Sequence, residues 1–412
     1  MSRGLTICLA AIAASAPIVV AHAQSATALY SFTAPPNGVR PAASVVADKK
    51  GDLFGTTYTV AANGTGTVYE LFPPAKGTDT WREKVLHRFS GQAHGHYPQS
   101  GLVLDADGNL YGTTINGSIN DAGTVFTLLK PAQLGKPWIE KVLLKFDGKK
   151  IGGTPYGGVV FGPGGNLYGT GGYGGTSGAG VVFMLSPNAG AKTGWTETVL
   201  YNFTNGTDGG YPYAVPAFDA AGNLYGTTLN GGNAGNGVVF RLVPPTSGTT
   251  WTEQVLHSFD ASTDGNFPRT GVILDASGNL YGTTENGGTF NWGTVFEVSP
   301  PVHGSSNWTE SVLHNFDFGT DGGNPGLSTL VQDNTGNLYG TTQVGGTPKG
   351  GIAFELSPPT GGGTSWTETI LNSFPSGTSP QAGFIFTADG KLTGTTFFGG
   401  ANNQGSVYQL TP

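Results

Sequence analysis

One heptapeptide, repeated along almost the whole chain, constrains the fold more than any other feature. It reads Gly-Asn-Leu-Tyr-Gly-Thr-Thr at residues 108–114, and close variants begin at Gly51, Gly165, Gly222, Gly278, Gly336 and Gly390. Successive copies start 57, 57, 57, 56, 58 and 54 residues apart. Such regular self-similarity is typical of a repeat architecture. We therefore predict seven copies of one structural unit.

Each unit contains four segments with the pattern of short β-strands. In one unit these are residues 101–104, 109–114, 123–128 and 138–144, and the turn 105–108 (Asp-Ala-Asp-Gly) separates the first two. Asp opens such a turn by bonding its own backbone, and Gly takes the left-handed position. Helices are excluded because Gly supplies 70 and Pro 26 of the 412 residues, and both disfavour helix interiors. The sequence predicts an all-β protein.

The two ends of the repeat region favour a closed ring over a linear solenoid. Residues 28–32 match the end of a fourth strand such as 255–259, whereas residues 405–410 match a third strand that no fourth strand follows. The N-terminal strand would therefore complete the last unit, which only a ring allows. We predict a seven-bladed β-propeller of four-stranded antiparallel blades, in which residues 24–412 form the single domain.

The first 23 residues have the pattern of a signal peptide. Arg3 precedes an apolar run from Leu9 to Val20, and Ala21-His22-Ala23 fits a cleavage site. The run is too short to anchor a protein stably across a bilayer. The single cysteine, Cys8, lies in this segment, so disulfides are not expected in the exported chain. We expect a secreted or periplasmic protein, cleaved near Ala23.

Composition and motifs also narrow the classes of function. Charged residues make up only 11% of the chain and the formal net charge is −7, so a nucleic-acid partner is not expected. No nucleophile elbow, metalloprotease motif or phosphate-binding loop occurs in the sequence. No second segment approaches membrane-spanning length. Whether the protein is an enzyme is uncertain, and the motifs favour a protein that binds rather than catalyses.

Several motifs recur in a fixed order and resemble a known repeat family. The heptapeptide, a following Gly-Gly loop, Gly-Thr-Val-Phe and a Trp-Thr-Glu tripeptide are similar to the GloVer tandem repeat of exported bacterial proteins. The resemblance covers residues 28–412 and implies a secreted or surface β-propeller of the choice-of-anchor type, often with a C-terminal sorting anchor. It implies no activity. Because the sequence ends at Pro412, free secretion or periplasmic residence is expected here.

The residues common to all repeats have structural explanations. We expect the Leu and Tyr of the heptapeptide to pack blade against blade, and its second Gly to allow close backbone approach. A Trp opens the fourth strand and should cover the neighbouring blade; it recurs at residues 81, 138, 195, 251, 308 and 366. The Asp turns resemble the start of a calcium loop but lack the Glu at its twelfth position, so we interpret them as turns.

Candidate ligand-binding residues come from the positions where the repeats differ. The residue after each inter-blade Pro should enter the innermost strand at the channel mouth, on the loop-rich face. These positions hold Ala42, Gln99, Tyr156, Tyr213, Arg269 and Gln381. Tyr, Gln and Arg around one opening would suit a sugar or a carboxylated ligand. Alternatively these side chains fill the channel and bond one another, with Arg269 paired to Glu285.

A metal site is a weaker hypothesis. His94 and His96 form a His-x-His motif that can hold a transition metal if further ligands converge, although we favour the interpretation as solvated loop histidines. His87, His257 and His314 recur at one repeat position, as do Asp208, Asp264 and Asp321, and both sets have structural explanations. No cofactor is predicted, and calcium or a transition metal stays open.

Three classes of function remain. We favour an exported, non-catalytic binding or scaffolding propeller, expected as a monomer, that recognises a glycan or an extracellular protein through its loop face. The first alternative is a polysaccharide lyase or hydrolase with its site at the channel mouth, where Arg would neutralise a carboxylate and Tyr or His would take a proton. The second alternative is a structural envelope protein without a ligand.

Overall fold

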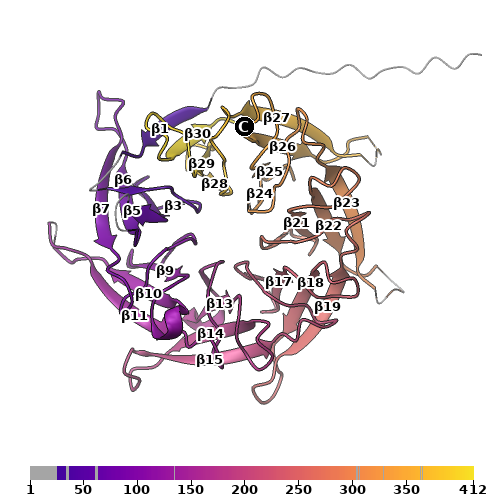
Figure 1. The fold of residues 1–412 in the computed structure, drawn as a ribbon, viewed down its shortest axis with the longest axis horizontal. Coiled ribbons are helices and arrows are strands. Elements are labelled where there is room, and N and C mark those ends of the chain that lie inside the picture. The colour runs from indigo at the N-terminus through magenta and orange to yellow at the C-terminus, as the bar shows by residue number, and fades with distance from the viewer. Residues whose placement is uncertain are drawn as a thin grey trace, which may run out of the picture.

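The fold is known from a computed structural model. It describes residues 26–33, 37–60, 64–133, 135–302, 305, 307–327, 329–361, 363 and 365–412. The predicted signal peptide and its cleavage site lie outside these residues. The described chain forms seven four-stranded antiparallel sheets, arranged as the blades of a ring around a central opening (Figure 1). This confirms the predicted seven-bladed propeller.

Each blade runs from an innermost strand to an outer one, in chain order. Blade 1 contains β3 (Val46–Ala47), β4 (Leu53–Thr57), β6 (Thr67–Phe72) and β7 (Arg82–Arg88). Blade 2 contains β8 (Val103–Leu104), β9 (Leu110–Thr114), β10 (Thr124–Leu129) and β11 (Ile139–Lys145). Blade 3 contains β12 (Val159–Phe161), β13 (Leu167–Gly171), β14 (Val181–Pro187) and β15 (Trp195–Asn202). Blade 4 contains β16 (Ala217–Phe218), β17 (Leu224–Thr228), β18 (Val238–Val243) and β19 (Thr252–Ser258).

Blades 5 and 6 repeat this order, whereas blade 7 takes its outer strand from the N-terminus. Blade 5 contains β20 (Ile273–Leu274), β21 (Leu280–Thr284), β22 (Thr294–Ser299) and β23 (Thr309–Asn315). Blade 6 contains β24 (Val331–Gln332), β25 (Leu338–Thr341), β26 (Ile352–Ser357) and β27 (Thr367–Ser373). Blade 7 contains β28 (Ile385–Phe386), β29 (Leu392–Thr396), β30 (Ser406–Leu410) and β1 (Thr27–Ser31). Outside the blades, β2 (Gly38–Val39) pairs with β5 (Thr59–Val60), and residues Ile119–Asp121 and Pro163–Gly165 form short 3₁₀ turns. Among the described residues, none of the helical segments is long and apolar enough to cross a membrane.

The N-terminal strand closes the ring, as the sequence predicts. β1 pairs antiparallel with β30, so that Thr27 faces Gln409 and Ser31 faces Ser406. In Figure 1 the indigo start of the described chain lies beside its yellow end. The closure is also buried, because the Phe32 side chain is fully enclosed in a cluster that contains Val407 of blade 7 and Tyr69 of blade 1.

The hydrophobic core lies between the blades. Seven clusters of buried side chains occur, one at each junction of neighbouring blades. At the junction of blades 4 and 5, for example, Tyr225 of blade 4 packs with Leu280 and Phe296 of blade 5. The recurring Trp covers the heptapeptide aromatic of the preceding blade, as in Trp308 on Tyr225, whose ring centroids lie 6.3 Å apart. The predicted blade-on-blade packing is therefore found.

The second glycine of the heptapeptide has a different role from the one expected. The sequence suggests close backbone approach, but a Cβ at Gly282 would lie 2.5 Å from the ring of Phe296, the residue directly opposite on β22. Gly226 under Phe240 and Gly340 under Phe354 repeat this arrangement. The missing side chain therefore makes room for an aromatic ring of the third strand.

The first threonine of each heptapeptide links its blade to the next. The Thr227 hydroxyl donates a hydrogen bond of 2.7 Å to the backbone carbonyl of Thr270, at the start of blade 5. The same bond joins blade 7 to blade 1, from Thr395 to the carbonyl of Ala43. Equivalent bonds are made by Thr56, Thr113, Thr170, Thr283 and Thr341. The repeat thus hydrogen-bonds the inner strands around the whole ring.

The Asp side chain of each turn accepts hydrogen bonds from the backbone of the same turn. Asp105 accepts hydrogen bonds from the backbone N–H groups of Asp107 and Asn109, and its second oxygen accepts from the Tyr111 hydroxyl. Asp219, Asp275 and Asp333 repeat the bond to a Tyr hydroxyl. The sequence interpretation of these segments as turns agrees with this geometry.

Candidate functional site

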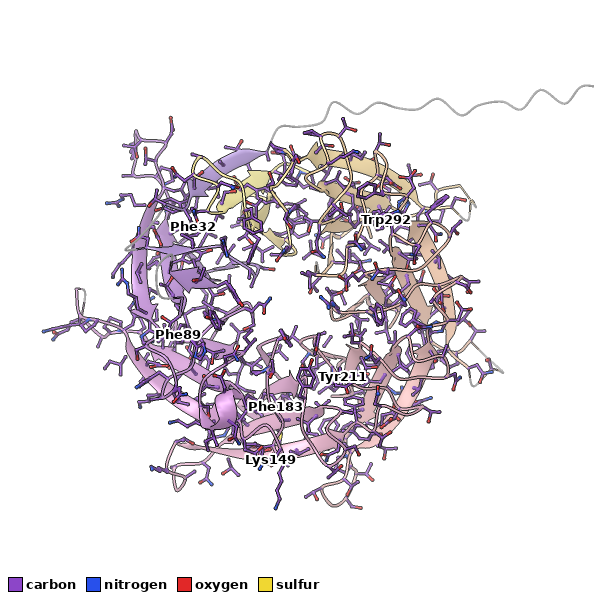
Figure 2. The ribbon with its side chains drawn as sticks, in the orientation of Figure 1. Phe32, Phe89, Lys149, Phe183, Tyr211 and Trp292 are labelled. Carbon is purple, nitrogen blue, oxygen red and sulfur yellow. The ribbon has the colours of Figure 1, made fainter. Side chains whose placement is uncertain are left out.

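A cavity of about 490 Å³ occupies the centre of the ring, lined in all seven blades by the segment that leads into the innermost strand or by the start of that strand. Figure 2 shows the side chains filling the blades around this centre. Its apolar wall includes Leu102, Val159, Leu330 and Phe384. The residues after six of the inter-blade prolines all line it, as the sequence predicts: Ala42, Gln99, Tyr156, Tyr213, Arg269 and Gln381. Their role in binding a ligand stays a prediction.

A repeated backbone conformation brings the chain into this cavity. The residue before every inter-blade Pro has a positive φ of 51–61°, although none of them is Gly: Arg40, Tyr97, Thr154, Tyr211, Phe267, Asn324 and Ser379. Such a conformation is unfavourable and needs support from its surroundings. At Tyr211, the N–H donates to the Ala179 carbonyl of blade 3, while its carbonyl accepts from the Leu229 N–H of blade 4. The loops that join blades are thus held to the loops between second and third strands, on one face.

Two tyrosines form the aromatic part of the cavity rim. The rings of Tyr156 and Tyr213 have centroids 4.4 Å apart, and the Tyr213 hydroxyl lies 2.8 Å from that of Tyr173. Tyr173 extends the group outward, since it is 42% exposed, and its ring also packs edge-on against Tyr211. The sequence interpretation missed Tyr173 and Tyr211.

These tyrosines are suited to hydrogen bonding rather than to base catalysis. Burial raises the pKa of Tyr213 well above its usual range, the hydrogen bond with Tyr173 adds to this, and nearby Arg269 opposes it only in part. Burial likewise raises the pKa of Tyr156. Both phenols therefore stay neutral at physiological pH and offer an apolar face with one polar group.

Arg269 is the one cationic residue among the described residues that line the cavity, and Glu285 contacts its guanidinium from one side. Arg269 Nε lies 2.9 Å from Glu285 Oε2, and the two side chains are 36% and 21% exposed. A Cβ at Gly326, the residue after the inter-blade Pro325 of blade 6, would come within 2.4 Å of the Glu285 side chain, so this position has no room for a side chain. The predicted Arg269–Glu285 ion pair is present, although its geometry at Nε is not that of a hydrogen bond. Within the described chain, the terminal guanidinium nitrogens of Arg269 are not seen to make a hydrogen bond either.

Further aromatic and cationic residues lie on the same face. Tyr58 stacks on Tyr97 with ring centroids 4.9 Å apart, and the Arg40 guanidinium lies over the Phe398 ring at 5.1 Å. Arg40, Tyr97 and Tyr211 each precede an inter-blade Pro. Variation at this position is the signal that could have found them, but sequence reasoning considered only the position after Pro.

The structure does not bring His94 and His96 onto one set of ligands. His94 Nδ1 lies 2.6 Å from Glu140 Oε2, on the outer strand of blade 2, whereas His96 Nε2 lies 3.6 Å from Asp121 Oδ1. The two imidazoles thus face different carboxylates. The hypothesis that they share a metal stays untested.

Comparisons with known proteins identify the family and the fold. The Gloeobacter/Verrucomicrobia repeat matches four overlapping segments, residues 18–217, 78–279, 136–326 and 214–412. The comparison with curated proteins gives no match. Among solved structures, the extracellular domain assigned to a one-component system of B. thetaiotaomicron is similar, with a TM-score of 0.53 and 10% identity over 94% of this chain and 41% of that one. The chain therefore spans less than half the length of that protein.

A second similar structure is a protein of Bacteroides uniformis assigned as a 6-phosphogluconolactonase, with a TM-score of 0.52 and 14% identity over 84% of this chain and 88% of that one. Identities this low establish a shared propeller fold and leave function to the site itself. The family match, in contrast, covers the chain from residue 18 to residue 412 and follows its repeats. On these grounds the chain belongs to the Gloeobacter/Verrucomicrobia repeat family.

Proposed function

We propose that this protein is an exported binding propeller whose central cavity takes an acidic saccharide from the loop face. The observation that carries the proposal is the convergence of Tyr156, Tyr213 and Arg269 with Gln99 and Gln381 on one cavity. Aromatic faces stack on sugar rings, amides bond hydroxyl groups, and a guanidinium binds a carboxylate. The signal-peptide pattern of residues 1–23 supports export.

The ion pair at Arg269 is consistent with anion binding. Glu285 approaches the guanidinium at Nε, so the terminal nitrogens can receive a carboxylate from the cavity side. Glu285 also keeps the guanidinium oriented before a ligand arrives. A ligand carboxylate would then meet a positioned cation at the cost of some repulsion from Glu285.

The protonation state of the cavity tyrosines favours binding over catalysis. The raised pKa of Tyr213 leaves little phenolate to remove a proton, and among the described residues no histidine lines the cavity. Since these lining residues include no Asp or Glu either, the lyase or hydrolase alternative has no ready general base among the described residues that line the cavity. A structural protein without a ligand would not need polar groups at this rim.

The test is a saccharide-binding series on purified residues 24–412, a fragment that includes every described residue. Uronate-containing oligosaccharides and their neutral, carboxyl-reduced forms are titrated by calorimetry. We expect binding of the acidic forms, and Arg269→Gln should weaken it by about 10–100-fold, because a hydrogen bond to a charged group contributes about 1.5–3 kcal/mol.

Glu285→Gln is the matched control. It breaks the same ion pair but removes a negative charge, so binding of acidic oligosaccharides should stay equal or become tighter. Equal loss in both variants would mean that the ion pair only maintains structure, and would contradict the proposal. Absence of binding to every saccharide would also overturn it, whereas release of unsaturated products would favour the lyase alternative.

A further inference from the structure

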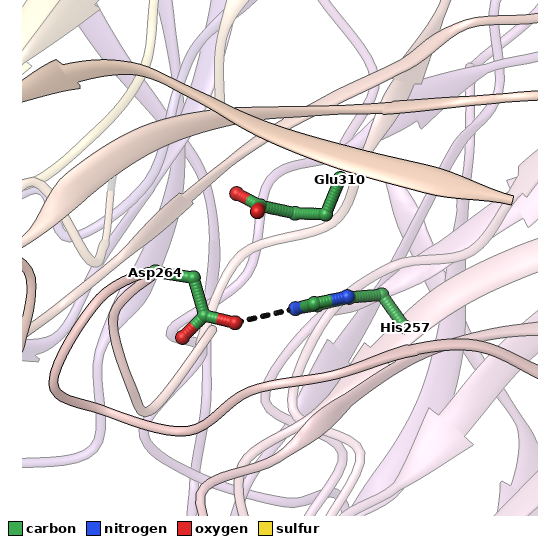
Figure 3. A group of neighbouring side chains, drawn as sticks. All are labelled: His257, Asp264 and Glu310. Atoms are coloured by element: carbon green, nitrogen blue, oxygen red, sulfur yellow. Dashed lines mark hydrogen bonds and ion pairs between the residues drawn. The ribbon is translucent and has the colours of Figure 1, made fainter.

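A second group of polar residues lies away from the cavity, at the junctions of neighbouring blades. At the junction of blades 4 and 5, His257 at the end of β19, Asp264 in the inter-blade loop and Glu310 on β23 face one another (Figure 3). At the junction of blades 5 and 6, His314, Asp321 and Glu368 occupy the same repeat positions. In each group, one ligand atom per residue lies within 4.8 Å of the other two.

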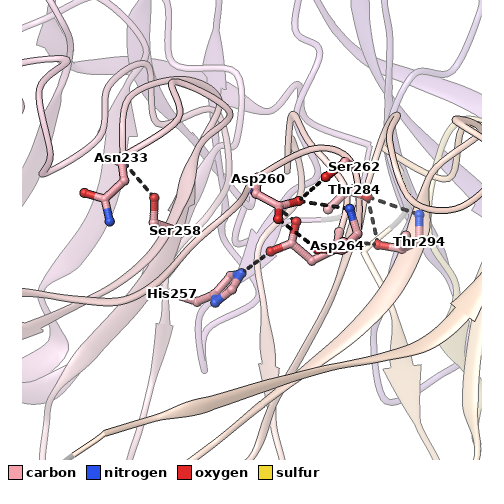
Figure 4. Close-up of polar contacts among 9 residues, drawn as sticks. Asn233, His257, Ser258, Asp260, Ser262, Asp264, Thr284 and Thr294 are labelled. Carbon is pink, nitrogen blue, oxygen red and sulfur yellow. Dashed lines mark hydrogen bonds and ion pairs between the residues drawn. The ribbon is translucent and has the colours of Figure 1, made fainter.

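The His–Asp contact at each junction is held in place by the backbone. His257 Nε2 lies 2.6 Å from Asp264 Oδ2, while Asp264 Oδ1 accepts a hydrogen bond from the Asp260 N–H (Figure 4). His314 and Asp321 repeat this arrangement at 3.1 Å, with the second Asp oxygen bonded to the Asp317 N–H. Asp264 is buried, with only 8% of its side chain exposed. Both carboxylates are thus oriented by fixed neighbours.

The glutamate of each group has an oxygen that accepts no hydrogen bond, and at Glu368 this oxygen, Oε1, lies 3.9 Å from His314 Nε2. Oε1 of Glu310 and Oε1 of Glu368 are both buried and accept no hydrogen bond. A buried carboxylate oxygen in this state is costly unless a donor or cation satisfies it. The nearby charges on Glu310 are those of Asp264 and Asp260, with only His257 in opposition. Acidic groups therefore outnumber basic ones at the point where the three side chains meet.

We propose that each of these two junctions binds a divalent transition-metal ion of the Zn²⁺ class, which clamps neighbouring blades together. One imidazole nitrogen and two carboxylate oxygens match the ligands of Zn²⁺, and their charge balances a divalent ion. Ca²⁺ takes six to eight oxygen ligands and suits the set less well. Neighbouring ligands of tetrahedral Zn²⁺ lie about 3.4 Å apart, so His257 and Asp264 must separate by less than about 1 Å.

Two other junctions provide natural comparisons. At the junction of blades 3 and 4, Tyr201 replaces the histidine, and its hydroxyl donates to Asp208 at 3.1 Å. Glu253 still has a buried, unpartnered Oε1 there. At the junction of blades 1 and 2, His94 replaces the Asp, and Glu140 lies 2.6 Å from His94 and 3.6 Å from His87. His87 and Glu140, rather than His96, are therefore the neighbours of His94.

The experiment counts Zn²⁺ bound to chelator-treated protein of residues 24–412, by calorimetry and by metal analysis after gel filtration. His257→Tyr and His314→Tyr copy the arrangement found at Tyr201, so the chain is expected to fold. Each should remove one equivalent of Zn²⁺ relative to wild type, and the double variant two. The reverse change, Tyr201→His, should add one equivalent, because Asp208 and Glu253 are already present.

Co²⁺ provides a second readout, since its visible absorption is strong only in a four- or five-coordinate site, and the His→Tyr variants should lose intensity. Because the Zn²⁺ bound by each variant is compared with that bound by wild type, any Zn²⁺ held at the junction of blades 1 and 2 cancels. Circular dichroism confirms that the variants are folded. The proposal is overturned if the double variant binds as much Zn²⁺ as wild type, or if Ca²⁺ binds at these junctions and Zn²⁺ does not.

Discussion

At the residue scale, the glutamate of the Trp-x-Glu tripeptide is the least expected feature of the repeat. Its Oε1 is buried and accepts no hydrogen bond in six blades, at Glu83, Glu140, Glu197, Glu253, Glu310 and Glu368. Burial raises the pKa of each of them. We expect a residue that recurs so regularly to contribute to packing, but the burial of this carboxylate has an electrostatic cost.

The electrostatic cost of burying this glutamate can be measured at Glu253, because Tyr201 replaces the histidine at its junction. Burial raises its pKa from 4.5 to about 7, and Asp208 adds to the effect. The unfolded chain therefore loses this proton near pH 4.5 and the folded chain only near pH 7. Between these values the folded protein binds more protons than the unfolded one, so the contribution of Glu253 to stability falls as pH rises.

Glu253→Gln should remove this dependence while keeping the shape of the side chain. We expect equal stability of variant and wild type near pH 5, and a more stable variant at pH 8, by on the order of 1 kcal/mol after allowance for solvent screening. Urea unfolding of both proteins at the two pH values measures the difference. A variant less stable than wild type at pH 8 would contradict the interpretation.

At the scale of the element, β1 connects two blades although it has only five residues. It supplies the outer strand of blade 7, and its Tyr30 hydroxyl and the nearby Asn37 amide both donate to Glu83 of blade 1. The following Phe32 is fully buried between the same two blades. The strand therefore pairs with one blade and packs on the next.

Removal of residues 24–33 should open the ring at this junction. β30 would become an unpaired edge, and the site of Phe32, whose truncation to Ala alone is expected to cost about 3–5 kcal/mol, would be empty. We expect a lower melting temperature and concentration-dependent aggregation, measured by circular dichroism and light scattering. A synthetic peptide of residues 26–33 should restore stability by strand addition. A truncated chain that melts like the parent would show that closure contributes little.

At the scale of the whole molecule, folding and stability should depend more on the order of blades around the ring than on the position of the chain ends. The pairing of Thr27 with Gln409 places the start of β1 beside the end of β30. A short Gly/Ser linker can therefore join residue 412 to residue 26, like the loops that join third and fourth strands elsewhere. New ends are placed in the exposed loop residues 246–250, between β18 and β19.

This circular permutant should fold with a melting temperature close to that of the parent, because every contact between blades is preserved and exposed loops tolerate new ends. β19 would then close blade 4 in the way that β1 closes blade 7. A second permutant, cut inside β17 between Gly226 and Thr227, should fail, since it interrupts a buried strand. Equal failure of both would indicate that closure by β1 itself is required.

Much of the architecture follows from the sequence alone. The heptapeptide spacing determines the number of blades, the Asp-x-x-Gly turns determine the hairpins, and the match of residues 28–32 to a fourth strand determines closure. Even the residues at the cavity could be located, because Arg269 and Tyr213 occupy one repeat position. These features depend on local periodicity, which is visible along the chain.

Only the tertiary structure decides which side chains meet across blades. Glu310 follows Asp264 by 46 residues, and nothing along the chain shows that it completes a group with His257. Tyr173 and Tyr213 likewise come from different blades, and the left-handed φ of Tyr211 depends on hydrogen bonds from both neighbours. The physical reason is that such contacts are set by the packing of one blade on another, whereas the periodicity of the sequence describes a single blade.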